Sequence, residues 1–226
     1  MESGVMLRDL PRISRCCIRA TILRFFLDVL RLRSSVRVPF TDERIEARPM
    51  VRYRRNRVAG ATYFFTVTLR NRESDALVQY WPELRKALAH THKRLPFRTD
   101  AMVVLPDHLH ALWTLPAEDD DYPNRWRMLK AYFVRLLRDN GESMVKNSKG
   151  EYALWQRRYW EHTIQNDRDL SAHVDYIHYN PVKHGLVTHA RAWPYSTFHR
   201  YVRKGMLSVD WGGSVNAQGV NGQYGE

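Results

Sequence analysis

The stretch Met102-Val103-Val104-Leu105-Pro106-Asp107-His108-Leu109-His110-Ala111-Leu112-Trp113 contains two apolar runs separated by Pro106-Asp107, a turn-forming pair. This pattern predicts two strands, 97–105 and 108–115, that are joined at the turn. Side chains two residues apart in a strand lie on the same face of a sheet. His108 and His110 are therefore expected to place two imidazoles side by side.

The segments around these two strands alternate between strand and helix patterns. Residues 61–70 are rich in β-branched and aromatic side chains, which predicts a strand, and 155–164 predict another. Apolar residues recur at helical spacing in 77–92, where Pro82 is tolerable only in the first turn, and in 124–140.

A last helix is predicted over 167–180. It begins at Asn166 or Asp167, both good N-caps, and ends at Asn180-Pro181. The elements then follow the order strand, helix, strand, strand, helix, strand, helix. This order predicts an α+β fold of the ferredoxin-like type, in which an antiparallel sheet carries helices on one face.

The chain divides into three parts by composition. Residues 1–49 are Arg-rich with one short helix pattern at 21–32, and Met50 leads directly into a strand pattern. We hypothesise that 1–49 are a mobile basic extension or the product of an upstream misassigned start, which N-terminal sequencing of the native protein distinguishes. Residues 50–211 are expected to form one domain, and the Gly-, Asn- and Gln-rich residues 212–226 a disordered tail.

The charge of the chain indicates a polyanionic partner. Formal net charge is +12 over 226 residues, with a sequence pI of about 9.9. A soluble protein can simply carry excess Arg, but here Arg residues interleave with aromatic ones, which favours nucleic acid. The cations expected to contact DNA are Arg52, Arg54, Arg55, Arg57, Arg125, Arg127, Lys130, Arg157, Arg158 and Lys183.

Cysteine usage and hydropathy indicate a cytoplasmic protein. The only cysteines, Cys16 and Cys17, are adjacent and cannot form a disulfide framework, which fits a reducing compartment. The apolar run 18–32 contains four charged residues, so a membrane span is not expected. No targeting segment is evident.

A second group of reactive residues follows downstream of the histidines. In a helix, Tyr176 and Asn180 lie one turn apart on one face. Two imidazoles, a phenol and a third polar ligand suit metal-assisted cleavage of a phosphodiester. Each residue alone also has a structural interpretation, since strand histidines and amphipathic-helix tyrosines usually serve packing. The chemical interpretation depends on their coincidence.

Five segments of the chain occur together in one known family. They are VLPDHLH (104–110), NRWRMLK (124–130), WQRRYWEH (155–162), HVDYIHYNPVKHG (173–185) and WPYSTF (193–198). As a set they resemble the REP-associated tyrosine transposases, relatives of the single-tyrosine HUH transposases of the IS200-like superfamily. The resemblance runs from about residue 53 to residue 211 and does not include 1–49.

This resemblance implies an HUH endonuclease fold, a metal site at His108 and His110, and a nucleophile at Tyr176. It also implies a third metal ligand four residues after the tyrosine, which is Asn180 here and usually Gln in the insertion-sequence relatives. Tyr179 is a rival nucleophile, but a different helix face separates it from Asn180. The cofactor would be Mg²⁺ or Mn²⁺.

The resemblance further implies a sequence-specific DNA endonuclease and strand transferase. Its partner would be single-stranded or hairpin DNA of the repetitive extragenic palindrome (REP) type, bound by a monomer rather than an obligate dimer. It would be a bacterial protein associated with the nucleoid. Two alternatives remain open: a non-catalytic binding module that displays Tyr63, Phe64 and Phe65 as a stacking platform, and a hydrolase with no covalent intermediate. Denaturing gels of labelled hairpin DNA with Mn²⁺ distinguish all three. The transposase forms a covalent adduct, the hydrolase cleaves the DNA without an adduct, and the binding module does neither.

Overall fold

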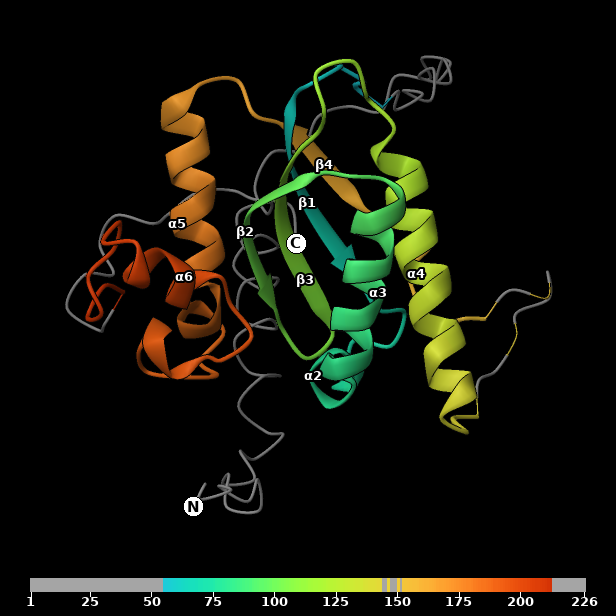
Figure 1. Cartoon of the computed structure of the whole chain (residues 1–226). Coiled ribbons are helices and arrows are strands. Elements are labelled where there is room, and N and C mark those ends of the chain that lie inside the picture. The colour runs from blue at the N-terminus through green and yellow to red at the C-terminus, as the bar shows by residue number, and fades with distance from the viewer. Residues whose placement is uncertain (1–54, 144–145, 147–149, 151, 213–226) are drawn as a thin grey trace, which may run out of the picture. The chain divides into compact units, whose positions relative to one another are not determined.

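The computed structural model of the chain describes residues 55–143, 146, 150 and 152–212 (Figure 1). The expectations for residues 1–49, for the helix 21–32 and for the two cysteines lie outside this part of the chain. So do those for Arg52, for Arg54 and for all of the tail except Gly212.

A four-stranded antiparallel sheet with the order β2-β3-β1-β4 forms the centre of the domain. Its strands are β1 (Thr62–Thr68), β2 (Arg98–Val104), β3 (His108–Thr114) and β4 (Trp160–Thr163). Helices connect β1 to β2 and β3 to β4, so that each crossover skips the strand between. This is the ferredoxin-like arrangement that the sequence predicts.

The helices are α2 (Ala76–Gln79), α3 (Trp81–Arg94), α4 (Tyr122–Asp139), α5 (Asp167–Lys183), the 3-10 turn η1 (Ala190–Ala192) and α6 (Phe198–Arg203). The predicted helix 77–92 is divided between α2 and α3. Pro82 lies in the first turn of α3, where its missing N–H costs no hydrogen bond. No helix in the described part of the chain is long and apolar enough to cross a membrane.

Helices α3 and α4 cover one face of the sheet, as predicted (Figure 1). Alternate residues of the central strands, including Phe65 and Trp113, pack there against the two helices. The Trp113 and Trp126 rings stack at 4.0 Å with an interplanar angle of 12°. This large aromatic core joins β1 and β3 to the two helices.

Helix α5 covers the opposite face, which the expectation of helices on one face did not include (Figure 1). The reason is visible in the strands, because Phe64 and Leu112 form a buried apolar patch on the second face of β1 and β3. Strands that are buried on both faces lose the simple alternation that marks a half-exposed sheet. Tyr176 and Ile177 of α5 pack against this second apolar surface.

Two predicted boundaries are wrong. The strand over 155–164 is restricted to β4, and Trp155 forms only an isolated bridge with Leu69. Helix α5 continues through Pro181 to Lys183. A proline in the last turn forfeits one backbone hydrogen bond, and the chain leaves the helix only at Gly185, whose φ is +67°.

Candidate active site and nucleic-acid groove

The two histidines of β3 lie side by side on the α5 face of the sheet. In the antiparallel register His110 pairs with Thr66 of β1, and His108 pairs with Thr68. The imidazole centroids are 5.0 Å apart, and both side chains are buried. Leu109, between them, packs on the other face. The predicted geometry of the pair is thus present.

Neighbouring groups orient both imidazoles. Nδ1–H of His108 donates to Asp107 Oδ1 at 2.8 Å, and His110 Nδ1 lies 3.0 Å from Thr66 Oγ1. Burial lowers the pKa of His108 despite the adjacent carboxylate, so the ring is neutral near pH 7. Burial is the largest single influence on the pKa of Asp107 and would raise it, but the hydrogen bond and charge of His108, together with the charge of Arg72 and a backbone hydrogen bond, outweigh burial and lower the pKa. A neutral imidazole with Nδ1 engaged offers Nε2 to a metal ion.

Asn180 is fully buried and lies on α5 between Tyr176, whose ring is next to His110, and His184, whose ring is next to His108. Neither Oδ1 nor Nδ2 of its amide has a hydrogen-bond partner among the described residues, and the same is true of His108 Nε2. An unsatisfied buried polar group costs about 1–3 kcal/mol. A divalent cation held by His108, His110 and Asn180 would take up His108 Nε2 and Asn180 Oδ1, so the residues fit the implied metal.

Tyr176 lies one helical turn before Asn180 and beside the histidines. Its ring centroid is 5.2 Å from that of His110 and 5.9 Å from that of Phe64. Lys183 Nζ lies 5.0 Å from the Tyr176 ring, which places one predicted DNA-binding cation at the active site. The rival, Tyr179, lies on another side of α5, next to Gly212.

Sequence reasoning missed one imidazole. His184 caps the C-terminus of α5, and its ring centroid is 5.3 Å from that of His108. The sequence could have predicted this position of His184. Tyr176, Asn180 and His184 follow one another at intervals of four residues, so they share one helix face. The predicted helix ended at Asn180, so His184 was not placed on that face.

A basic groove of about 1300 Å³ lies along α4 and the segment that leads into β4. None of the described residues that line it is acidic. The groove also contains the aromatic rings of Trp126, Tyr152, Trp155 and Tyr159. Its nine cations are Arg55, Arg70, Arg127, Lys130, Arg135, Arg138, Lys146, Arg157 and Arg158.

Cations of this groove lie over its aromatic rings. Arg55 Cζ is 4.2 Å from the Tyr159 ring centroid, and Lys130 Nζ is 5.3 Å from the same ring and 5.6 Å from that of Trp155. Burial, with a smaller effect of Arg55, lowers the pKa of Lys130 to about 8. A phosphate in the groove would relieve this repulsion between cations.

Comparison with known proteins agrees with this geometry. Residues 58–180 match the family described as IS200-like transposases. The chain is 46% identical to a REP-associated tyrosine transposase from Escherichia coli (strain K12) over 74% of this chain and 93% of that protein. A relative from Haemophilus influenzae of the same transposase type is also 46% identical, over 73% of this chain and 95% of the relative.

The chain belongs to the REP-associated tyrosine transposases. A solved structure of such a transposase bound to a REP hairpin is 43% identical, with a TM-score of 0.65. The match covers 77% of this chain and 99% of that one. The family of the chain and its fold, both predicted from the sequence, are thereby confirmed.

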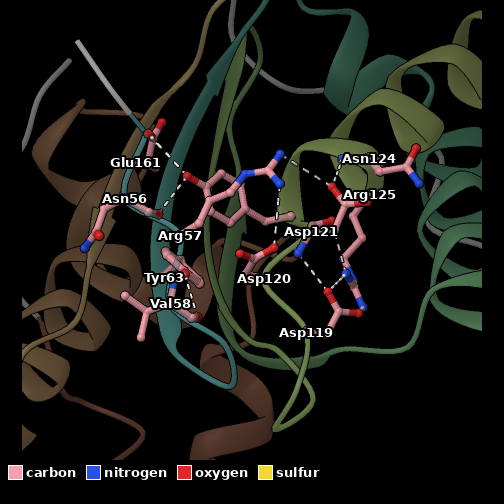
Figure 2. A network of polar contacts seen from close by, with 11 residues as sticks. Asn56, Arg57, Val58, Tyr63, Asp119, Asp120, Asp121, Asn124, Arg125 and Glu161 are labelled. Atoms are coloured by element: carbon pink, nitrogen blue, oxygen red, sulfur yellow. Dashed lines mark hydrogen bonds and ion pairs between the residues drawn. The ribbon is translucent and has the colours of Figure 1, made fainter.

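One predicted DNA contact of this transposase does not fit the groove. Arg125 is buried, and Figure 2 shows its guanidinium turned toward the acidic loop. It donates to Asp119 Oδ2 at 2.7 Å and to the Pro96 carbonyl at 2.7 Å. We therefore correct the expectation for Arg125, which ties α4 to the loop before it. Arg57 is exposed but lies 3.6 Å from Asp120, so a phosphate would have to compete with that carboxylate.

Arg125→Ala is expected to destabilise the fold by about 2–4 kcal/mol, because it removes the donor that Asp119 Oδ2 and the Pro96 carbonyl share. The hydrogen bond from Arg125 lowers the pKa of Asp119, so its contribution exists above about pH 4 and is lost as acid protonates the carboxylate. Urea unfolding at pH 7 and pH 3 measures both effects. Arg127→Ala, on the exposed side of α4, is the control, and equal stability of the two variants would contradict the prediction.

Proposed function

We propose that the protein is a metal-dependent, sequence-specific single-stranded DNA endonuclease and strand transferase. It acts on REP-type DNA hairpins through a covalent 5′-phosphotyrosine intermediate. The observation that supports this best is the contact of Tyr176 from α5 with His110 from β3, with His108 beside His110 on the same face and Asn180 one turn after Tyr176. That a family member has been solved with a REP hairpin supports the choice of substrate.

Tyr176 would supply the nucleophile. A free phenol has a pKa of about 10 and is a weak nucleophile at neutral pH, so its activation depends on the site. Its oxygen attacks the phosphorus and loses its proton, the bond from phosphorus to the 3′-oxygen breaks, and that oxygen leaves as a 3′-hydroxyl. The phosphotyrosyl ester conserves the bond, so a second 3′-hydroxyl can rejoin the strand without ATP.

His108, His110 and Asn180 would hold the divalent cation, Mg²⁺ or Mn²⁺. When bound, it supplies charge neutralisation at the phosphate and polarises the phosphorus. Asp107 and Thr66 keep the two rings in place. His184, which lies beside His108, offers a further imidazole to the same centre, and Lys183 offers a positive charge to the phosphate.

The groove and an exposed tryptophan suggest the path of the DNA. Trp160 of the edge strand β4 pairs with Thr66, and Thr66 pairs with His110, so the three residues form a row across the sheet. Neighbouring strands are about 4.8 Å apart, which places Trp160 about 10 Å from His110. A strand whose phosphates occupy the groove would cross β4 with one base on Trp160 and reach Tyr176.

Trp160→Ala is expected to weaken binding of hairpins with a single-stranded foot by about 1–3 kcal/mol, the worth of one stacked base. Trp160→Phe, which retains an aromatic face, should retain most of the affinity. Fluorescence anisotropy with a labelled hairpin measures both. Equal affinity of the alanine variant would place the strand elsewhere.

Neutralising Arg127, Arg157 and Arg158 with Gln should weaken binding to any DNA. The slope of log K against log salt should become shallower by about 0.7 for each single-strand phosphate that the protein no longer neutralises. Sequence preference should survive, because phosphate contacts position the protein whereas base contacts specify the site. The control replaces three exposed cations of α3, Arg85, Lys93 and Arg94, and changes the net charge equally. If both triple variants show the same slope, the groove does not bind DNA.

The test of the proposed function is a covalent adduct. Full-length protein is incubated with 5′- or 3′-labelled hairpin DNA and Mn²⁺, then denatured and run on a gel. We expect protein-linked label only when the label is on the fragment 3′ of the break. Binding without cleavage would favour the non-catalytic module, but the structure removes its stacking platform, because Tyr63, Phe64 and Phe65 are all buried. Cleavage without an adduct would favour the hydrolase.

The monomeric state and the cytoplasmic, nucleoid-associated location remain predictions. Gel filtration with multi-angle light scattering, with and without hairpin DNA, tests the first.

A further inference from the structure

A second cluster of metal-ligating side chains lies on the α5 face, outside the proposed active site. His162 comes from β4, Asp169 from the first turn of α5, and His173 from the next turn. One ligand atom from each of the three lies within 4.8 Å of the other two. Among the described residues, no other group of three His, Cys, Asp or Glu side chains meets this condition.

The carboxylate is at the centre of the cluster. His162 Nε2 lies 2.8 Å from Asp169 Oδ2, and His173 Nδ1 lies 2.9 Å from Asp169 Oδ1. Metal–ligand bonds of about 2.0–2.2 Å in a tetrahedral site place ligand atoms about 3.4 Å apart. Small side-chain rotations would therefore let all three residues share one ion.

This cluster is separate from the proposed catalytic centre. The Phe64 ring lies next to both groups, with its centroid 4.7 Å from that of His173 and 5.4 Å from that of His110. None of the three residues His162, Asp169 and His173 belongs to the set that would hold the catalytic metal. A cation here would therefore be a second one.

We propose that His162, Asp169 and His173 form a second divalent-cation site, suited to a transition ion such as Zn²⁺, Co²⁺ or Mn²⁺. Two imidazoles and one carboxylate are ligands that such ions accept, whereas Mg²⁺ and Ca²⁺ prefer oxygen ligands alone. Without an ion, His162 Nε2–H donates to the Asp169 carboxylate. His173 Nδ1–H lies 2.8 Å from the main-chain carbonyl of Asp169 and 2.9 Å from its carboxylate, and these contacts hold the cluster together. A bound ion replaces those protons.

The site would fix the helix that carries the nucleophile. Helix α5 packs chiefly on β2 and β3, whereas His162 belongs to β4, at the opposite edge of the sheet. An ion shared by these residues cross-links β4 to the first two turns of α5, and Tyr176 follows His173 by three residues. The three ligands are thus positioning residues. This role, but not the existence of the site, depends on the proposed function.

The test measures metal binding rather than DNA cleavage. Untagged, full-length protein is stripped of metal and titrated with Zn²⁺ by calorimetry and with Co²⁺ by its visible d–d absorption. Four chains are compared: the wild type, the His108→Ala/His110→Ala variant, His162→Gln and Asp167→Asn. Asp167 lies in the same first turn of α5 but outside the cluster, so its variant is the matched control.

We expect two equivalents of Co²⁺ for the wild type and the control, and one for the other two chains. Adding His162→Gln to the His108→Ala/His110→Ala variant should weaken the remaining equivalent by at least about 100-fold. If the His108→Ala/His110→Ala variant binds no ion while the wild type binds one, the second site does not exist. If the wild type binds one ion that His162→Gln abolishes, the second site stands and the proposed catalytic metal site fails. Should the His108→Ala/His110→Ala variant not fold, the His162→Gln variant alone is the test: loss of one equivalent supports the second site, and unchanged stoichiometry contradicts it.

Discussion

Tyr176→Phe is expected to abolish covalent capture and strand cleavage of REP-type hairpins while DNA affinity changes by less than about twofold. The substitution removes only the hydroxyl oxygen, so the ring still packs against Phe64 and His110. Loss of an essential nucleophile lowers a rate by about 10⁴-fold or more. Cleavage is followed on denaturing gels, and binding by anisotropy under the same conditions.

Tyr179→Phe is the matched control, because it makes the same chemical change three residues further along α5, on another side of the helix. It should cleave at the wild-type rate. The reverse outcome, cleavage that persists in Tyr176→Phe and disappears in Tyr179→Phe, would assign the nucleophile to Tyr179. It would also leave the packing of Tyr176 against the histidines without a catalytic role.

His108→Ala and His110→Ala are each expected to lower cleavage by about 10³-fold or more, the scale on which loss of charge stabilisation in the transition state acts. The effect should come from lost metal binding rather than from loss of the fold. Raising the Mn²⁺ concentration should then restore part of the activity wherever the remaining ligands still hold the ion. Binding to hairpin DNA should persist, since the groove cations are untouched.

Both histidines are buried, so each cleavage assay is accompanied by thermal unfolding and circular dichroism. His110→Gln serves as a second variant that fills more of the space. Treatment of the wild type with EDTA should reproduce the defect and Mn²⁺ should reverse it. Normal cleavage by both alanine variants with Mg²⁺ or Mn²⁺ would show that the imidazoles are structural.

The elements that the sequence predicted well are those with a strong local signal. The two apolar runs and the Pro106-Asp107 turn between them were sufficient to place His108 and His110 on one face, because side-chain direction in a strand is fixed by the backbone. The crossover order of strands and helices likewise indicated the ferredoxin-like class. The strand order within the sheet depends on long-range pairing, which no local pattern carries.

The errors have a common physical origin in tertiary context. The charge of the chain placed Arg125 among the cations expected to contact DNA, but Asp119, six residues earlier, forms an ion pair with its guanidinium. The expected helix end at Asn180-Pro181 followed the usual effect of proline, yet packing carries α5 one turn further, and His184 enters the site. The resemblance could name Asn180 as a candidate ligand, but where Asn180 lies relative to the two histidines depends on how α5 packs on the sheet, which the sequence does not specify.

Because side chains of β3 alternate between two faces, the strand tolerates a substitution far better than an insertion or a deletion. Leu109 and Ala111 face α3 and α4, whereas His108 and His110 face α5. Inserting or deleting one residue between the Pro106-Asp107 turn and Trp113 would exchange the two sets, so that imidazoles enter the aromatic core and aliphatic side chains face the tyrosine. Evolution can therefore vary individual side chains here, but insertions and deletions must accumulate in the loops, where a change of length leaves the register intact.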